Sequence, residues 1–268
     1  GKEIDMYNPK FKLGIEYNGS VYHATINGLY DNKPKNYHQQ KFLLAKEKGI
    51  HLINIFDVDF EQNKDKILAY LADIIKPKHR LYARKCAIQL LNKQVAWDFY
   101  DEYHLQGKSY MSQINYGLYY ENELIAVMGF GKLRMKNAIR ENCYELHRYC
   151  VKHGYTVIGG AEKLFKHFII EYDPKYIKSY SDNNYFLGGM YEKLGFKYVG
   201  QSAISYFWVL KNKKLSREQC QVKKLKDKYP DLYTKAIEED VSNKEDYIMA
   251  SLGACKVYTA GNSIWEYI

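Results

Sequence analysis

The sequence predicts an α/β protein with more than one folded part. Along most of the chain, apolar stretches of strand length alternate with stretches whose apolar residues recur at helical spacing. The 46% of hydrophobic and 26% of charged residues are proportions of a packed globular chain. A length of 268 residues is enough for two hydrophobic cores.

The first segment is predicted to fold as strand, strand, helix, strand and helix. Asn8-Pro9 and Asn18-Gly19 are turn dipeptides, and we expect the second to close a hairpin. Gly49 follows the first helix as a C′ glycine would, and Pro77 ends the second helix. The expected strands are residues 3–7, 12–17 and 51–56, and the expected helices are residues 37–48 and 64–75.

A basic connector at residues 76–85 leads to a second segment that again alternates between strands and helices. Its expected strands are residues 114–120, 123–130, 144–150, 176–180, 196–199 and 206–210, and its expected helices are residues 93–103, 160–170 and 187–194. Glu121-Asn122 is expected to close a hairpin. The tail, residues 215–268, is expected to hold two helices and a final hairpin at residues 260–262. We therefore predict three domains at residues 1–79, 80–212 and 213–268.

Charge and cysteine content limit the class of partner and the compartment. The formal net charge of +9 and a pI near 9.0 favour nucleic acid as a partner, and DNA is the one we expect. The sequence contains no run of 18 apolar residues, so we expect no membrane span. It has no apolar signal core near the N-terminus, so we do not expect secretion. Five scattered cysteines without a CxxC pair argue against a zinc site or a disulfide framework, so we expect an intracellular protein. The sequence does not indicate the oligomeric state.

Two carboxylates near the N-terminus could form a metal site. Asp5 lies on one expected strand, and Glu16 lies on the next. Oxygen ligands brought together in this way suit Mg²⁺ or Mn²⁺, which would activate water for phosphodiester hydrolysis. His23 could act as general base or acid, and His38 and Lys41, at i and i+3, could hold a phosphate or a metal-bound water. Ordinary surface carboxylates are the alternative.

The longer text around these residues resembles a known nuclease family. The strings EIDMYNPKFKLGIEYNGSVYH and YHQQKFLLAKEKGIHLINIFDVDF are similar to very-short-patch-repair endonucleases of the PD-(D/E)XK type, and look closest to relatives in phage homing endonucleases. The resemblance implies that Asp5 and Glu16 bind the metal and that His23 is catalytic. Asn18 stands where many members have Lys. Relatives carry an upstream helix with another Glu, and this sequence begins with Gly1 after that point, so we expect a truncated nuclease core. The resemblance to phage homing endonucleases implies a bacterial cell infected by phage as the setting.

A second pattern lies in the middle of the chain. The string YELHRYCVKHGYTVIGGAEKLFKHFI places a strand before a Gly-Gly-Ala turn and a helix. The unpaired N–H groups of a helix start can bind a pyrophosphate. The string SYSDNNYFLGGMYEKLGFKYVGQ then adds a strand, a short helix and a further strand. Glycines that serve only turns are the alternative.

Together these two strings resemble the GNAT acyltransferase fold, and more narrowly its Mom-like DNA-modification branch, over residues 85–210. The resemblance implies acetyl-CoA as the cofactor. It would be held by Val157, Ile158, Gly159, Gly160 and Ala161. Thr156 stands where Arg or Gln is expected. His104 and Asp182 match Mom-like positions and could serve as base, metal ligand or base-reading pair, or simply as a loop residue and a cap.

Three functional hypotheses follow. The leading one is a metal-dependent, homing-type DNA endonuclease whose GNAT-like domain and basic C-terminal extension position DNA. The second is a GNAT/Mom-like acyltransferase that modifies a nucleobase or an amine. The third is a DNA-binding protein without catalysis. A run of basic residues could contact phosphates, or could be a solvated helix face: Lys211, Lys213, Lys214, Arg217, Lys223, Lys224, Lys226 and Lys228.

Overall fold

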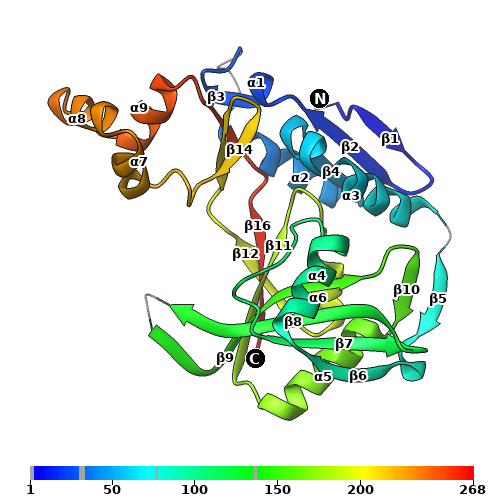
Figure 1. The fold of residues 1–268 in the computed structure, drawn as a ribbon. Helices are drawn as coiled ribbons and strands as arrows, with labels where there is room; N and C mark the ends of the chain where they lie inside the picture. The colour runs from blue at the N-terminus through cyan, green and yellow to red at the C-terminus, as the bar shows by residue number, and fades with distance from the viewer. Residues whose placement is uncertain (1–2, 30–33, 77, 136–137) are drawn as a thin grey trace. The chain divides into compact units, whose positions relative to one another are not determined.

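The computed structural model describes residues 3–29, 34–76, 78–135 and 138–268, and it shows a mixed α/β protein (Figure 1). The chain divides into two compact units, each assembled from three stretches of sequence. Unit 1 comprises residues 1–62, 182–187 and 202–262, and unit 2 comprises residues 63–181, 188–201 and 263–268. Within the described residues, no helix is long and apolar enough to cross a membrane.

Unit 1 begins with a three-stranded sheet in the order β1-β2-β4. β1 (Met6–Asn8) is antiparallel to β2 (Leu13–Asn18), and β2 is parallel to β4 (His51–Phe56). The helix α2 (Tyr37–Glu47) connects the two parallel strands, and α3 (Asp57–Ile75) follows β4. β4 is buried along almost its whole length, as its apolar sequence predicts.

The expected hairpin at Asn18-Gly19 is wrong. β2 ends at Asn18, and Gly19 is instead the N-cap of a short helix, α1 (Ser20–His23), which leads into β3 (Ala24–Ile26). The backbone N–H of Ser20 donates a hydrogen bond to Asp57 Oδ2 at 2.8 Å, and this holds the helix start. A contact to a residue so distant in sequence overrides the local turn signal.

A second sheet of unit 1 has the order β14-β13-β15-β3. β13 (Tyr206–Leu210), β14 (Lys213–Ser216) and β15 (Cys255–Tyr258) are antiparallel neighbours. Three helices follow β14 rather than the two predicted for the tail: α7 (Val222–Lys228), α8 (Pro230–Glu238) and α9 (Lys244–Ser251). Trp208, fully buried, lies in the core that β13 and these helices share.

Unit 2 is built on a seven-stranded sheet in the order β12-β16-β11-β9-β8-β7-β6. The bounds of its strands are β6 Ala87–Leu91, β7 Ile114–Tyr120, β8 Glu123–Met135, β9 Ala138–Val151, β11 Tyr176–Asp182, β12 Lys197–Gln201 and β16 Asn262–Tyr267. The expected hairpin at Glu121-Asn122 is confirmed: β7 pairs with β8, and both turn residues have positive φ. The helices are α4 (Lys93–Tyr103), α5 (Gly160–Tyr172) and α6 (Gly189–Lys193).

Two helices cover opposite faces of this sheet (Figure 1). The side chains of Ala126, Met128 and Phe130 on β8 pack in one core with residues of α5. The alternate residue Val127 packs with Ala96 and other residues of α4. This alternation is the period of two expected for a strand buried on both faces.

Two further expectations need correction. The predicted basic connector contains a strand, β5 (His79–Tyr82), and a 3₁₀ turn, η1 (Ala83–Lys85). β5 forms a parallel pair with β10 (Tyr155–Ile158), so non-local pairing creates both strands. The predicted final hairpin does not form either, because β15 and β16 belong to different sheets.

Candidate active site

Two parallel strands in the middle of the unit 2 sheet separate part of the way along their length. β11 pairs with β9 from Tyr176↔Cys143 to Ser179↔Leu146. Beyond that register both strands continue, and β9 stays paired with β8 on its other side. Within the described chain, no ladder pairing therefore joins residues 147–151 of β9 to residues 180–181 of β11. We call this the β9–β11 opening.

A tyrosine hydroxyl lies at the point where the two strands separate. Ser179 Oγ donates to the Leu146 carbonyl oxygen at 2.7 Å and lies 2.8 Å from Tyr191 Oη. Tyr191 comes from α6, and its ring stacks on Trp265 with centroids 5.4 Å apart. Burial raises the pKa of Tyr191 above its ordinary value, so the hydroxyl keeps its proton at neutral pH.

The glycine before α6 makes this ring stack possible. Gly188, with φ +85°, is the N-cap of α6. A Cβ atom at this position would lie 2.2 Å from Trp265 Cζ2. Trp265 is fixed in turn by a 2.9 Å hydrogen bond from its Nε1 to Ser181 Oγ. Gly188 thus allows close packing of Trp265 beside Tyr191.

A histidine and a carboxylate lie on β9 next to the same opening. His147 Nδ1 is 3.2 Å from Glu145 Oε1. A change of register opposite Gly129 and Phe130 makes His147 the extra residue of a β-bulge, a feature that re-aims side chains. His147 Nε2 is buried and has no hydrogen-bond partner among the described residues. A Cβ atom at Gly131 would lie 2.8 Å from it, so Gly131 keeps that space clear.

Polar side chains around Arg148 complete this region. Arg148 Nε donates to the Gly107 carbonyl oxygen at 3.1 Å, and Nη1 donates to the His147 carbonyl oxygen at 2.8 Å. His104, one of the predicted site residues, follows α4, and its Nδ1 accepts the Gln106 N–H at 3.1 Å. Burial, with smaller effects of Arg148 and Lys66, lowers the pKa of His104 to about 3. A histidine with this pKa is neutral and a weak base at neutral pH.

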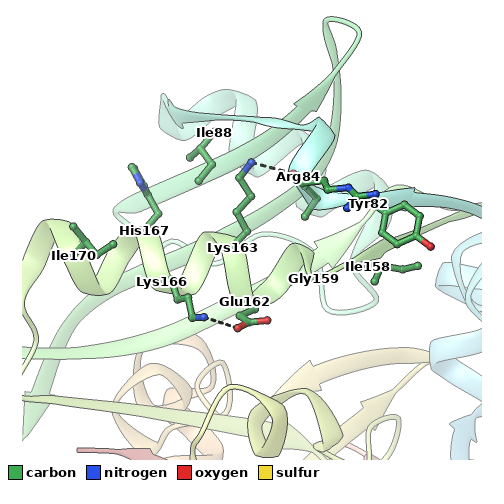
Figure 2. Close-up of a pocket in the computed structure, with 11 residues that line it drawn as sticks. Tyr82, Arg84, Ile88, Ile158, Gly159, Glu162, Lys163, Lys166, His167 and Ile170 are labelled. Atoms are coloured by element: carbon green, nitrogen blue, oxygen red, sulfur yellow. Dashed lines mark hydrogen bonds and ion pairs between the residues drawn. The ribbon is translucent and has the colours of Figure 1, made fainter.

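The start of α5 borders a pocket of about 700 Å³ (Figure 2). Gly159, with φ +74°, is the N-cap of α5, and within the described chain no side chain caps this helix start. Ile158 and Gly159 line the pocket, whereas Val157 and Gly160 are buried and Ala161 is partly buried. The other lining residues are Tyr82, Ala83, Arg84, Ile88, Glu162, Lys163, Lys166, His167 and Ile170.

Cationic groups dominate the polar lining of this pocket. Lys163 Nζ donates to the carbonyl oxygens of Ala83 at 3.0 Å and Cys86 at 2.5 Å, which ties α5 to η1. Lys166 forms an exposed ion pair with Glu162 at 2.6 Å. Arg84 comes from η1, the segment predicted to be a connector. Sequence reasoning missed Arg84 because only the pairing of β5 with β10 brings it to α5.

The predicted N-terminal site residues do lie close together, in unit 1. Glu16 and Lys41 are both buried and form an ion pair, and Glu16 Oε1 also accepts the Asp5 N–H at 3.1 Å. Asp5 Oδ2 accepts the backbone N–H of Tyr17 at 2.9 Å. No group of three or more His, Cys, Asp or Glu suited to a metal ion occurs in the described residues.

The two histidines of this cluster contact each other. His23 Nδ1 and His38 Nε2 are 3.1 Å apart, and their rings stack with centroids at 4.9 Å. The remaining predicted site residue, Asp182, ends β11 and accepts hydrogen bonds from the backbone N–H and side-chain amide of Asn184 at 2.9 and 2.8 Å. Asp182 belongs to unit 1 and His104 to unit 2.

At the level of sequence, the chain has a short match to a viral protein. No family model matches the sequence. A stretch of 75 residues, 28% of the chain, is 33% identical to the uncharacterized protein 307L of Invertebrate iridescent virus 6, and the match spans 38% of that protein's length.

Similar solved structures include the ribosomal-protein-S18-alanine N-acetyltransferase of Escherichia coli, at 15% identity and a TM-score of 0.34 over 45% of this chain and 81% of that one. A Bacillus subtilis acetyltransferase in complex with CoA matches at 16% identity and a TM-score of 0.33 over 68% and 97% of the two chains. A GNAT family acetyltransferase from Elizabethkingia anophelis with acetyl-CoA bound matches at 14% identity and 0.33 over the same shares.

The leading hypothesis of a metal-dependent DNA endonuclease is wrong, because the side chains expected to bind the metal are already bonded to other groups of the chain. In unit 1 the carboxylate expected to bind Mg²⁺ or Mn²⁺, Glu16, is already ion-paired with Lys41. A metal would have to displace a buried ammonium group from its counter-charge, which is costly.

Proposed function

We propose that unit 2 is an acyltransferase that moves the acyl group of acetyl-CoA to an amine. The observation that carries the proposal is the β9–β11 opening, with Tyr191, Glu145 and His147 at the point where the strands separate. Acetyl-CoA supplies an activated acyl group as a thioester. The chain must then bind an elongated molecule with phosphates at one end, accept a proton from the amine and provide a proton to the departing sulfur.

The backbone of the opening suits an extended arm that contains amides. Strand residues that lack a ladder partner present N–H and C=O groups in regular order, and an added strand-like ligand can pair with them. Where the two strands have separated, residues 147–151 of β9 and 180–181 of β11 offer such edges on the sides that face the opening.

The start of α5 suits the phosphates. Gly159 in the left-handed conformation begins a 13-residue helix, and the unpaired N–H groups of its first turn favour an anion. Arg84 and Lys166 add positive charge along the adjoining pocket (Figure 2). The pocket, with a volume of about 700 Å³, is large enough for a nucleotide-sized group. These observations support residues 157–161 as the phosphate-binding segment.

Residues at the point where β9 and β11 separate can accept and supply the protons of the reaction. An attacking amine must lose a proton, and His147, oriented by Glu145 at 3.2 Å, has an unpartnered nitrogen that can take it. Glu145 in this position would stabilise the resulting imidazolium. The Tyr191 hydroxyl keeps its proton at neutral pH, because burial raises its pKa, and can supply that proton to a leaving thiolate.

Calorimetric titration of the protein with acetyl-CoA, followed by a free-thiol assay with a panel of amines, tests this proposal. We expect saturable binding and thiol release that depends on the amine. Arg84→Gln should weaken binding about tenfold through loss of one charge-assisted contact, whereas exposed Lys193→Gln should leave it unchanged. Absence of binding in the unaltered protein, together with absence of thiol release, would overturn the proposal.

A further inference from the structure

Positive charge is concentrated in one short part of unit 1. Residues 211–228 hold eight basic and two acidic residues, so their net charge is +6 out of +9 for the whole chain. This basic segment contains the turn between β13 and β14, the strand β14, and α7 (Figure 1). Lys211 and Asn212 form the turn of this hairpin, both with positive φ, as two-residue hairpin turns require.

Most of these cations point to solvent. The exposed ones are Lys211, Lys213, Arg217, Lys223, Lys224, Lys226 and Lys228. Lys214 differs, because it is partly buried and ion-paired with Asp59 at 2.7 Å, which is a structural contact. The pair of Lys224 with Glu218, at 3.3 Å, is exposed and therefore weak. The field of the segment is thus largely uncompensated.

A pocket of about 270 Å³ is lined by residues of this segment together with Tyr229 and Met249. Its apolar and aromatic lining residues are Leu215, Cys220, Leu225, Tyr229 and Met249, and the others are Gln219, Lys224 and Lys228. Lys228 Nζ lies 5.2 Å from the Tyr229 ring centroid. An aromatic and apolar surface bordered by lysines suits a flat ring whose attached groups are anionic.

We infer that the basic segment binds single-stranded nucleic acid, with phosphates on the lysines and one base in the Tyr229 pocket. A strand with exposed bases uses both features, whereas a duplex would use the charge alone. A membrane surface fits less well, because the apolar residue Leu225 of α7 is buried and cannot insert into lipid. The inference concerns unit 1 and is independent of the acyltransferase proposal for unit 2.

Fluorescence anisotropy with a labelled 20-mer, as a single strand and as a duplex, tests the inference across a range of salt concentrations. Changing Lys223, Lys224, Lys226 and Lys228 together to Gln should weaken single-strand binding more than about tenfold and lower the salt slope by about 2–3, at roughly 0.7 per lost phosphate contact. The matched control changes four scattered exposed lysines, Lys48, Lys93, Lys193 and Lys197, to Gln. It alters the net charge equally and should change affinity by less than about threefold.

The pocket is tested separately by Tyr229→Leu, which keeps an apolar side chain and removes the ring. Single-strand affinity should fall about 5-fold or more with the salt slope unchanged, while Tyr110→Leu, at an exposed tyrosine of unit 2, should have no effect. Thermal unfolding checks that each variant is folded. Equal loss in the scattered control, equal affinity for duplex and single strand, or preferential binding to vesicles containing phosphatidylserine would each overturn the inference.

Discussion

The buried Glu16–Lys41 pair of unit 1 and the β9–β11 opening of unit 2 both contain charged or titratable side chains, but they differ in how those groups are paired. In unit 1, Glu16 and Lys41 neutralise each other in a buried ion pair. In unit 2, His147 Nε2 is buried without a hydrogen-bond partner in the described chain, and it lies just beyond the point where the pairing of β9 with β11 ends. Residue types that are common in active sites therefore indicate an active site less reliably than side chains that can still form hydrogen bonds.

The largest effect is expected from breaking the buried ion pair of unit 1. Lys41→Met should lower the free energy of unfolding by about 3–5 kcal/mol, because Glu16 would stay buried without its counter-charge. Lys152→Met, which breaks the more exposed pair with Glu123, should cost only about 0–1 kcal/mol. Urea denaturation measures both values. A loss of unfolding free energy below about 1 kcal/mol for Lys41→Met would mean that the Glu16–Lys41 pair does not neutralise a buried charge as described.

The second prediction concerns turnover at the opening. His147→Ala should reduce the rate of acyl transfer about 10²–10⁴-fold, with acetyl-CoA binding retained, because it removes the proton acceptor. His79→Ala, at an exposed histidine of β5, should leave the rate unchanged. Steady-state assays with the best amine measure the effect. An unchanged rate in the His147 variant would remove this residue from the proposed chemistry.

A third prediction tests the packing behind Tyr191. Gly188→Ala should destabilise the protein by about 2–4 kcal/mol, since it combines a positive φ with a Cβ atom 2.2 Å from Trp265. Gly253→Ala has a similar φ of +76° but no neighbour within 4 Å, so only the backbone cost of about 1 kcal/mol should remain. The two melting temperatures give the comparison. Equal shifts would show that the contact with Trp265 carries no strain.

The smallest effect is a dependence of stability on pH that arises at His104. Its pKa is lowered to about 3 in the folded protein, so its contribution is present above the unfolded value of 6.5 and is lost as pH falls toward 3. Between pH 7 and pH 5 the loss should be about 1–2 kcal/mol. His104→Asn keeps an acceptor for the Gln106 N–H and should lack this part of the pH dependence. Parallel pH profiles of both proteins would contradict the assignment.

Local signals in the sequence predicted local structure well. The Glu121-Asn122 turn, the buried strand β4 and the helix that starts after Gly159 all occur where their residues indicate. Failures arose where distant residues decide the outcome. Asp57 holds the helix start after Gly19, and β10 makes a strand of the supposed connector.

In the candidate site too, the features set by neighbouring residues could be predicted, and those set by distant residues could not. The Gly-Gly turn before α5 was evident from the sequence because a helix start needs only neighbouring residues. His147 and Glu145 lie within a string already noted for its strand, yet their pairing depends on a β-bulge opposite Gly129 that no local pattern announces. Tyr191, on α6, becomes a candidate site residue only because it contacts Ser179 on β11.

The position of β16 in the seven-stranded sheet has a consequence for the order of folding. β16 lies between β11 and β12, although about 60 residues, including all of α7, α8 and α9, separate it from β12 in sequence. β12 can therefore join its sheet only after the chain has travelled through the other unit and returned. During synthesis from the N-terminus, β11 would keep an open edge throughout that interval, a stage at which a nascent chain is exposed to wrong pairing.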